Sequence, residues 1–171
     1  ADIRTVYQKE TINTEGAQNQ WSFSYGANLS DKIFLGAGLG ITSLRYQAKK
    51  TYTESNFNFE LDPGFNPLDN LVLEEEIDIS GSGINGTFGL IARPIDMVQV
   101  GISYTTPTRY NLTDTYRATV NTLWNNFDYY GDGDLLSDVK EESDDVISEY
   151  HLKTPGRLNV GTSVFFEKFG F

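Results

Sequence analysis

Three aspartates in the stretch DYYGDGDLLSDV have the spacing of a calcium-binding loop. Asp128, Asp132 and Asp134 would occupy the first, fifth and seventh positions of an EF-hand loop, which supplies oxygen ligands there. Tyr130 stands at the third position and Val139 at the twelfth, so the bidentate acid is missing. A weak calcium site at the three aspartates is one expectation, and an acidic surface turn is the other.

The other residues that could do chemistry form no catalytic set. The stretch GSGING, residues 81–86, matches the G-x-G-x-x-G dinucleotide fingerprint, which requires a helix to begin there. A strand-like pattern, TFGLIAR, follows instead, so we expect these glycines to serve a bulge and close packing. His151 is the only histidine, and no nucleophile elbow accompanies it. The sequence therefore predicts a protein that is not an enzyme and needs no cofactor, apart from the weak calcium site.

Strands with two unlike faces are the main local pattern. In WSFSYGANLSDKIFLGAGLGI, large apolar residues alternate with Ser, Gly and Asn, and a turn is expected at residues 30–31. The alternation continues through residues 84–105, with a tight turn expected at residues 93–96. It returns in residues 150–166, and a further short turn is expected at residues 167–168. We expect an all-β, antiparallel up-and-down meander.

The acidic residues are concentrated in two segments. The chain has 171 residues, no Cys and a formal net charge of −11. Residues 47–77 hold seven acids and two bases, and residues 113–148 hold nine acids and two bases. We expect these segments to form two long extracellular loops, after a leading strand or linker at residues 1–19. No basic stripe is present, which argues against nucleic acid as a partner.

The two-faced strands fit the wall of a transmembrane β-barrel. Lipid requires an apolar outer face, and a lumen favours small or polar residues on the inner face. The alternative is a soluble or surface β-sandwich that binds a partner or calcium through its acidic loops. By alternation, the candidates for lumen or ligand contacts are Arg109, Arg157, Ser103 and Asn159. An inward arginine either faces a substrate carboxylate or pairs with an inward acid such as Glu149.

Three stretches carry a resemblance to a known family. GTFGLIARPIDMVQVGISYTTPTRYNL resembles part of the barrel wall of the FadL-type outer-membrane transporters of long-chain fatty acids and other hydrophobic compounds. HLKTPGRLNVGTSVFFEKFGF is similar to a later strand of that family, and WSFSYGANLSDKIFLGAGLGI to a preceding hairpin. Some relatives are labelled hemin receptors, which would make His151 a candidate heme ligand.

The resemblance implies a location and a set of partners. It implies passive uptake of hydrophobic small molecules in the bacterial outer membrane, with lipid around the barrel. It also implies that residues 1–171 are a central barrel segment, excised from a longer chain and lacking the plug. Such a segment is expected to self-associate through its open strand edges.

Overall fold

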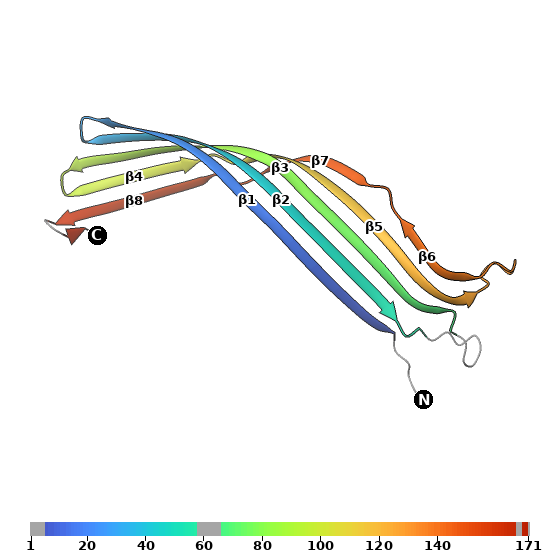
Figure 1. Ribbon diagram of the computed structural model, residues 1–171. Helices are drawn as coiled ribbons and strands as arrows, with labels where there is room; N and C mark the ends of the chain where they lie inside the picture. The colour runs from blue at the N-terminus through green and yellow to red at the C-terminus, as the bar shows by residue number, and fades with distance from the viewer. Residues whose placement is uncertain (1–5, 58–65, 167–168, 171) are drawn as a thin grey trace. The chain divides into compact units, whose positions relative to one another are not determined.

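The computed structural model describes residues 6–57, 66–166 and 169–170, and these are all-β (Figure 1). The strands are β1 (Tyr7–Leu29), β2 (Ile33–Ser55), β3 (Leu68–Ile95), β4 (Val98–Thr105), β5 (Arg109–Phe127), β6 (Leu136–Glu142), β7 (Val146–Lys153), β8 (Arg157–Phe166) and β9 (Phe169–Gly170). Within these described ranges, no helix is long and apolar enough to cross a membrane.

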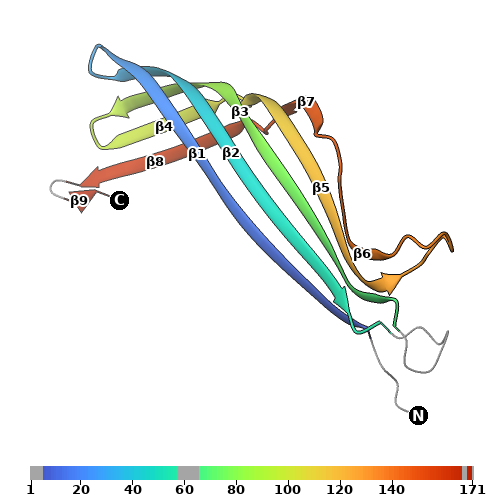
Figure 2. The same cartoon turned by 45° about the vertical axis from the view of Figure 1, so that its right-hand side comes forward.

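The strands form one antiparallel meander. The sheet order is β1-β2-β3-β4-β8-β9, and β5 pairs with β3, β6 and β7. β4 and β5 follow one another beside β3 and are separated by residues 106–108, while β6, β7 and β8 follow one another beside β5 and β4 (Figure 2). The expected meander is confirmed. The described strands form an open sheet rather than a closed barrel, because β1 pairs with β2 alone.

The chain divides into two compact units that differ in charge. Unit 1 comprises residues 1–16, 46–79 and 114–148, and unit 2 comprises residues 17–45, 80–113 and 149–171. Unit 1 has 20 acidic and six basic residues, so its formal net charge is −14. Unit 2 has four acidic and seven basic residues, so its formal net charge is +3. Strands β1, β2, β3, β5 and β7 each contribute residues to both units.

The first short turn lies at the predicted residues, and the second lies further along the chain than predicted. Ser30 and Asp31 both have positive φ, 63° and 57°, as a tight hairpin turn requires. The turn expected at residues 93–96 lies instead at Asp96 and Met97, because β3 continues to Ile95. The register shifts between Ala92 and Ile95, around a proline that has no N–H to donate. The turn expected at residues 167–168 falls outside the described residues.

Both acidic segments are mostly strand, which corrects the loops expected at residues 47–77 and 113–148. β2 runs on to Ser55 and β3 begins at Leu68, while β5 runs on to Phe127 and β6 begins at Leu136. Cross-strand ion pairs connect these charged strands. Lys50 Nζ lies 3.2 Å from Glu10 Oε1 on β1 and 3.3 Å from Glu75 Oε2 on β3.

The described residues bury almost no apolar core. Leu68, Tyr110 and Leu112 are the buried large hydrophobic residues among them, and many others are exposed. They form a single sheet, so the second sheet of the alternative β-sandwich is not found in the part of the chain that the structure describes.

Candidate functional site

Unit 2 has an apolar face. Residues that pair directly across neighbouring strands project from the same side of a sheet. The paired rows on one side are Phe88–Tyr104–Leu158, Leu90–Ile102–Val160 and Ala92–Val100–Thr162. We call this side of unit 2 the apolar face.

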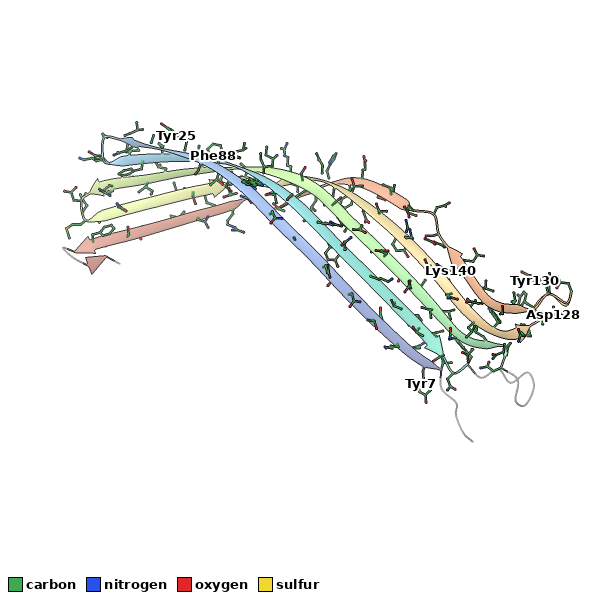
Figure 3. All side chains as sticks on the ribbon, viewed as in Figure 1. Tyr7, Tyr25, Phe88, Asp128, Tyr130 and Lys140 are labelled. Carbon is green, nitrogen blue, oxygen red and sulfur yellow. The ribbon has the colours of Figure 1, made fainter. Side chains whose placement is uncertain are left out.

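The large side chains of the apolar face are exposed. On β1, Trp21 is 73% exposed and Tyr25 is 79% exposed. Tyr25 and Phe88 help to line an open hollow together with Leu35, Leu90 and other apolar residues (Figure 3). Contiguous apolar surface of this kind marks a face that meets lipid or a partner.

The opposite side of unit 2 is built from small and polar residues. Its paired rows are Thr87–Thr105–Arg157, Gly89–Ser103–Asn159 and Ile91–Gly101–Gly161. We call this side the small-residue face. The structure thus brings together two of the residues expected in a lumen, because Ser103 Oγ accepts a hydrogen bond from Asn159 Nδ2 at 3.4 Å.

A second hollow lies on the small-residue face. Phe34 and Ile91 line it beside Ser103 and Asn159. Its floor is formed by Gly36, Gly89, Gly101 and Gly161. The guanidinium carbon of Arg93 lies 5.4 Å from the centre of the Phe34 ring. Sequence reasoning missed Phe34 and Ile91, although both are large apolar residues at positions otherwise held by Gly and Ser.

Two of these glycines are not required by packing. A Cβ atom added at Gly89 or Gly161 would meet no other atom within 4 Å. At Gly83, in contrast, the added Cβ would lie 2.6 Å from Cδ1 of Tyr110. Packing would therefore allow a larger residue at Gly89 and Gly161, and the glycines leave open space in the hollow.

Arg157 lies on the small-residue face, as the alternation predicts. It is opposite Thr105 on β4, and Thr105 is opposite Thr87 on β3. The ion pairs formed by the described residues do not include Arg157, so the pairing with Glu149 considered above is not found there. Its guanidinium is available to an anionic group on that face.

Arg109 lies on the apolar face, which corrects its predicted inward position. It lines an open hollow with Leu39, Ile84 and Lys153. The cause is the interruption at residues 106–108, after which the alternation of β5 is reversed relative to that of β4. Ser103 and Arg109 therefore point to opposite sides despite their shared odd numbering.

The same reversal turns Tyr110 onto the small-residue face. Tyr110 is 5% exposed, and its ring lies against Gly83. Its hydroxyl accepts a hydrogen bond from Gln18 Nε2 at 3.0 Å, and Asn85 Nδ2 donates to Thr108 Oγ1 at 3.1 Å. The GSGING stretch is thus part of β3, as the strand pattern predicts, and its glycine at position 83 admits an aromatic ring.

The expected calcium loop lies between β5 and β6, and its carboxylates bind the loop backbone. Asp128 Oδ1 accepts from the Gly131 N–H at 2.6 Å, and its Oδ2 accepts from the Gly133 N–H at 3.1 Å (Figure 3). Asp132 Oδ1 accepts from the Asp134 N–H at 3.1 Å. No group of three or more Asp, Glu, His or Cys side chains that could hold a metal ion is found within the described ranges. Both alternatives for this loop, the weak calcium site and the acidic surface turn, stay predictions.

Unit 1 contains a hydrogen-bonded row across four strands. Besides its contacts with Lys50, Glu75 accepts a hydrogen bond from the Tyr116 hydroxyl at 2.8 Å. This hydrogen bond, and then that from Lys50, hold the pKa of Glu75 below its ordinary value. Hydrogen bonds to Glu10 and Glu75 raise the pKa of Lys50. These contacts link β1, β2, β3 and β5 through Glu10, Lys50, Glu75 and Tyr116.

The role of His151 as a heme ligand stays a prediction. His151 is an exposed residue of β7, two positions before Lys153. A scan against known protein families finds no match to the chain, and neither does a search of curated proteins.

Proposed function

We propose that this chain is part of an outer-membrane channel for the passive uptake of hydrophobic molecules such as long-chain fatty acids. The observation that carries the proposal is the pair of unlike faces in unit 2. The row Leu90–Ile102–Val160 and the adjacent row Gly89–Ser103–Asn159 belong to the same strands but face opposite sides. A wall between hydrocarbon and a lumen needs this arrangement.

The apolar face supports contact with lipid. An aromatic side chain presents roughly 150–250 Å² of surface, and burial of apolar surface contributes about 25 cal/mol per Å². For Trp21, which is 73% exposed, transfer into hydrocarbon would contribute about 3–5 kcal/mol. Unit 1 has a net charge of −14 and fits an aqueous extension of the same strands.

The small-residue face supports passage rather than chemistry. The glycine-floored hollow lets an apolar chain contact the backbone closely, with Phe34 and Ile91 as apolar neighbours. Ser103 and Asn159 add polar contacts, and Arg157 would attract the carboxylate of a fatty acid. The proposed mechanism is weak binding and diffusion, with no bond made or broken.

Depth-dependent fluorescence quenching tests the proposal. The chain has two tryptophans, so Trp124→Phe leaves Trp21 alone and Trp21→Phe leaves Trp124 alone as the matched control. In vesicles of phosphatidylcholine with brominated acyl chains, we expect strong quenching of Trp21 and little quenching of Trp124. If Trp21 is quenched by aqueous iodide and not by the brominated lipid, the apolar face meets water and the proposal fails.

A further inference from the structure

Two cations stand side by side on the apolar face of unit 2. The Thr154 N–H donates to the Thr108 carbonyl at 3.0 Å, and the Thr108 N–H donates to Thr154 Oγ1 at 3.0 Å. Because β5 and β7 pair at this point, Arg109 and Lys153 are the next residues opposite one another. Both side chains line the same open hollow.

Neither cation has an acidic partner among the residues that the structure describes. The ion pairs of the described residues include neither Arg109 nor Lys153. Directly opposed like charges destabilise neighbouring strands. The chain has 24 Asp and Glu residues and only 13 Lys and Arg residues, so two neighbouring bases without an acidic partner are unusual for its composition. An anion in the hollow would remove this repulsion.

The hollow also has large apolar residues. Leu39 and Ile84 line it, and they are 45% and 50% exposed. Pro107, Asn85, Gly86 and Thr106 complete the lining. A ligand that carries a negative group next to hydrocarbon can contact both the cations and the apolar residues.

We infer that Arg109 and Lys153 bind the phosphate group of a membrane lipid, whose acyl chains lie against Leu39 and Ile84. The inference rests on the proposed function, because it requires the apolar face to meet lipid. The guanidinium of Arg109 can donate two parallel hydrogen bonds to phosphate oxygens, and Lys153 adds a point charge. The site therefore gives the chain a preference for phosphorylated, anionic lipids.

The test compares two kinds of vesicle. The full chain is titrated with phosphatidylcholine vesicles with and without phosphatidic acid, and binding is followed by tryptophan fluorescence. Because each Lys or Arg near an anionic surface contributes roughly fivefold in affinity, two predict about a 30-fold preference for the anionic vesicles. The double variant Arg109→Gln/Lys153→Gln should lose most of this preference. The matched control Lys9→Gln/Lys140→Gln removes two exposed lysines of unit 1 and should retain it.

The outcomes separate the inference from the proposed function. If the Arg109→Gln/Lys153→Gln chain keeps its preference, or the control loses its preference equally, the phosphate site is refuted although lipid binding stands. If millimolar inorganic phosphate abolishes the preference, the site takes free phosphate and the lipid assignment is refuted. If the wild-type chain binds neither vesicle, the proposed function fails, and the inference fails with it.

Discussion

Replacing Ile102 by Arg gives the sharpest energetic test of the two faces. Ile102 is 43% exposed at the centre of the apolar face, between Leu90 and Val160. An arginine on the lipid face of a membrane barrel costs about 2–4 kcal/mol near the middle of the bilayer. An exposed residue that meets water usually tolerates substitution within about 0.5 kcal/mol. We therefore expect Ile102→Arg to lower the free energy of unfolding in vesicles by about 2–4 kcal/mol.

The matched control is the adjacent residue on the opposite face. Ser103→Arg introduces the same side chain one position later in β4, opposite Gly89 and Asn159. In a lumen that admits water, we expect it to cost less than about 1 kcal/mol. Urea unfolding of the vesicle-bound chain, followed by fluorescence, measures both changes. The reasoning is refuted if Ile102→Arg costs less than about 0.5 kcal/mol, or if the two variants cost the same.

Four further predictions address packing, charge and passage. Gly83→Ala should cost about 1–3 kcal/mol in urea unfolding, because the new Cβ would lie 2.6 Å from the Tyr110 ring. In a Tyr110→Ala background the cost should shrink, with the contact to Thr108 Cγ2 at 3.0 Å remaining, and an unchanged cost would contradict this. Lys50→Met should lower the free energy of unfolding slightly at low salt and leave it unchanged at high salt, and a loss that does not depend on salt would exclude a screened ion pair. The folded protein lowers the pKa of Glu75, so the ionised Glu75 stabilises the fold above its ordinary pKa of 4.5, and this stabilisation is lost as the pH falls through the lower folded-state pKa. The loss of stability caused by Tyr116→Phe should therefore shrink over that acidic range. A loss that stays constant with pH would contradict this. Gly89→Val should leave the midpoint of urea unfolding unchanged, since a Cβ atom added at Gly89 would meet no atom within 4 Å. The larger side chain would stand in the hollow and should slow the entry of a fluorescent fatty acid into vesicles that contain the chain. Unchanged entry would show that the fatty acid does not pass through this hollow.

The strands and their faces could be predicted where the pattern is local. Alternation places Leu90, Ile102 and Val160 on one side, and the register confirms this placement. The alternation of apolar and polar residues with a period of two can be recognised from neighbouring residues in the sequence alone. The positions of Ser103 and Asn159 follow from the same rule, and these residues do meet in one hollow.

The errors arise where contacts are distant or alternation is interrupted. The side of Arg109 depends on how many residues of the TTPT stretch leave the strand, and the proline signals only that an interruption is present. The number of acidic residues in a segment predicts a solvated loop, but it does not show which basic residues pair with them on neighbouring strands. Lys50 is 40 positions from Glu10 and 25 from Glu75, so the contacts that keep these segments extended are visible only in three dimensions.

The two units differ in what it would cost to carry them through hydrocarbon. The hairpin tips of unit 2 at Asp31 and Asp96 carry few charges, so each tip could pass with one or two carboxylates protonated. Unit 1 would bring 20 carboxylates, at a cost of several kcal/mol for each one that stays ionised. The translocation of unit 1 would therefore be the costly part of membrane insertion.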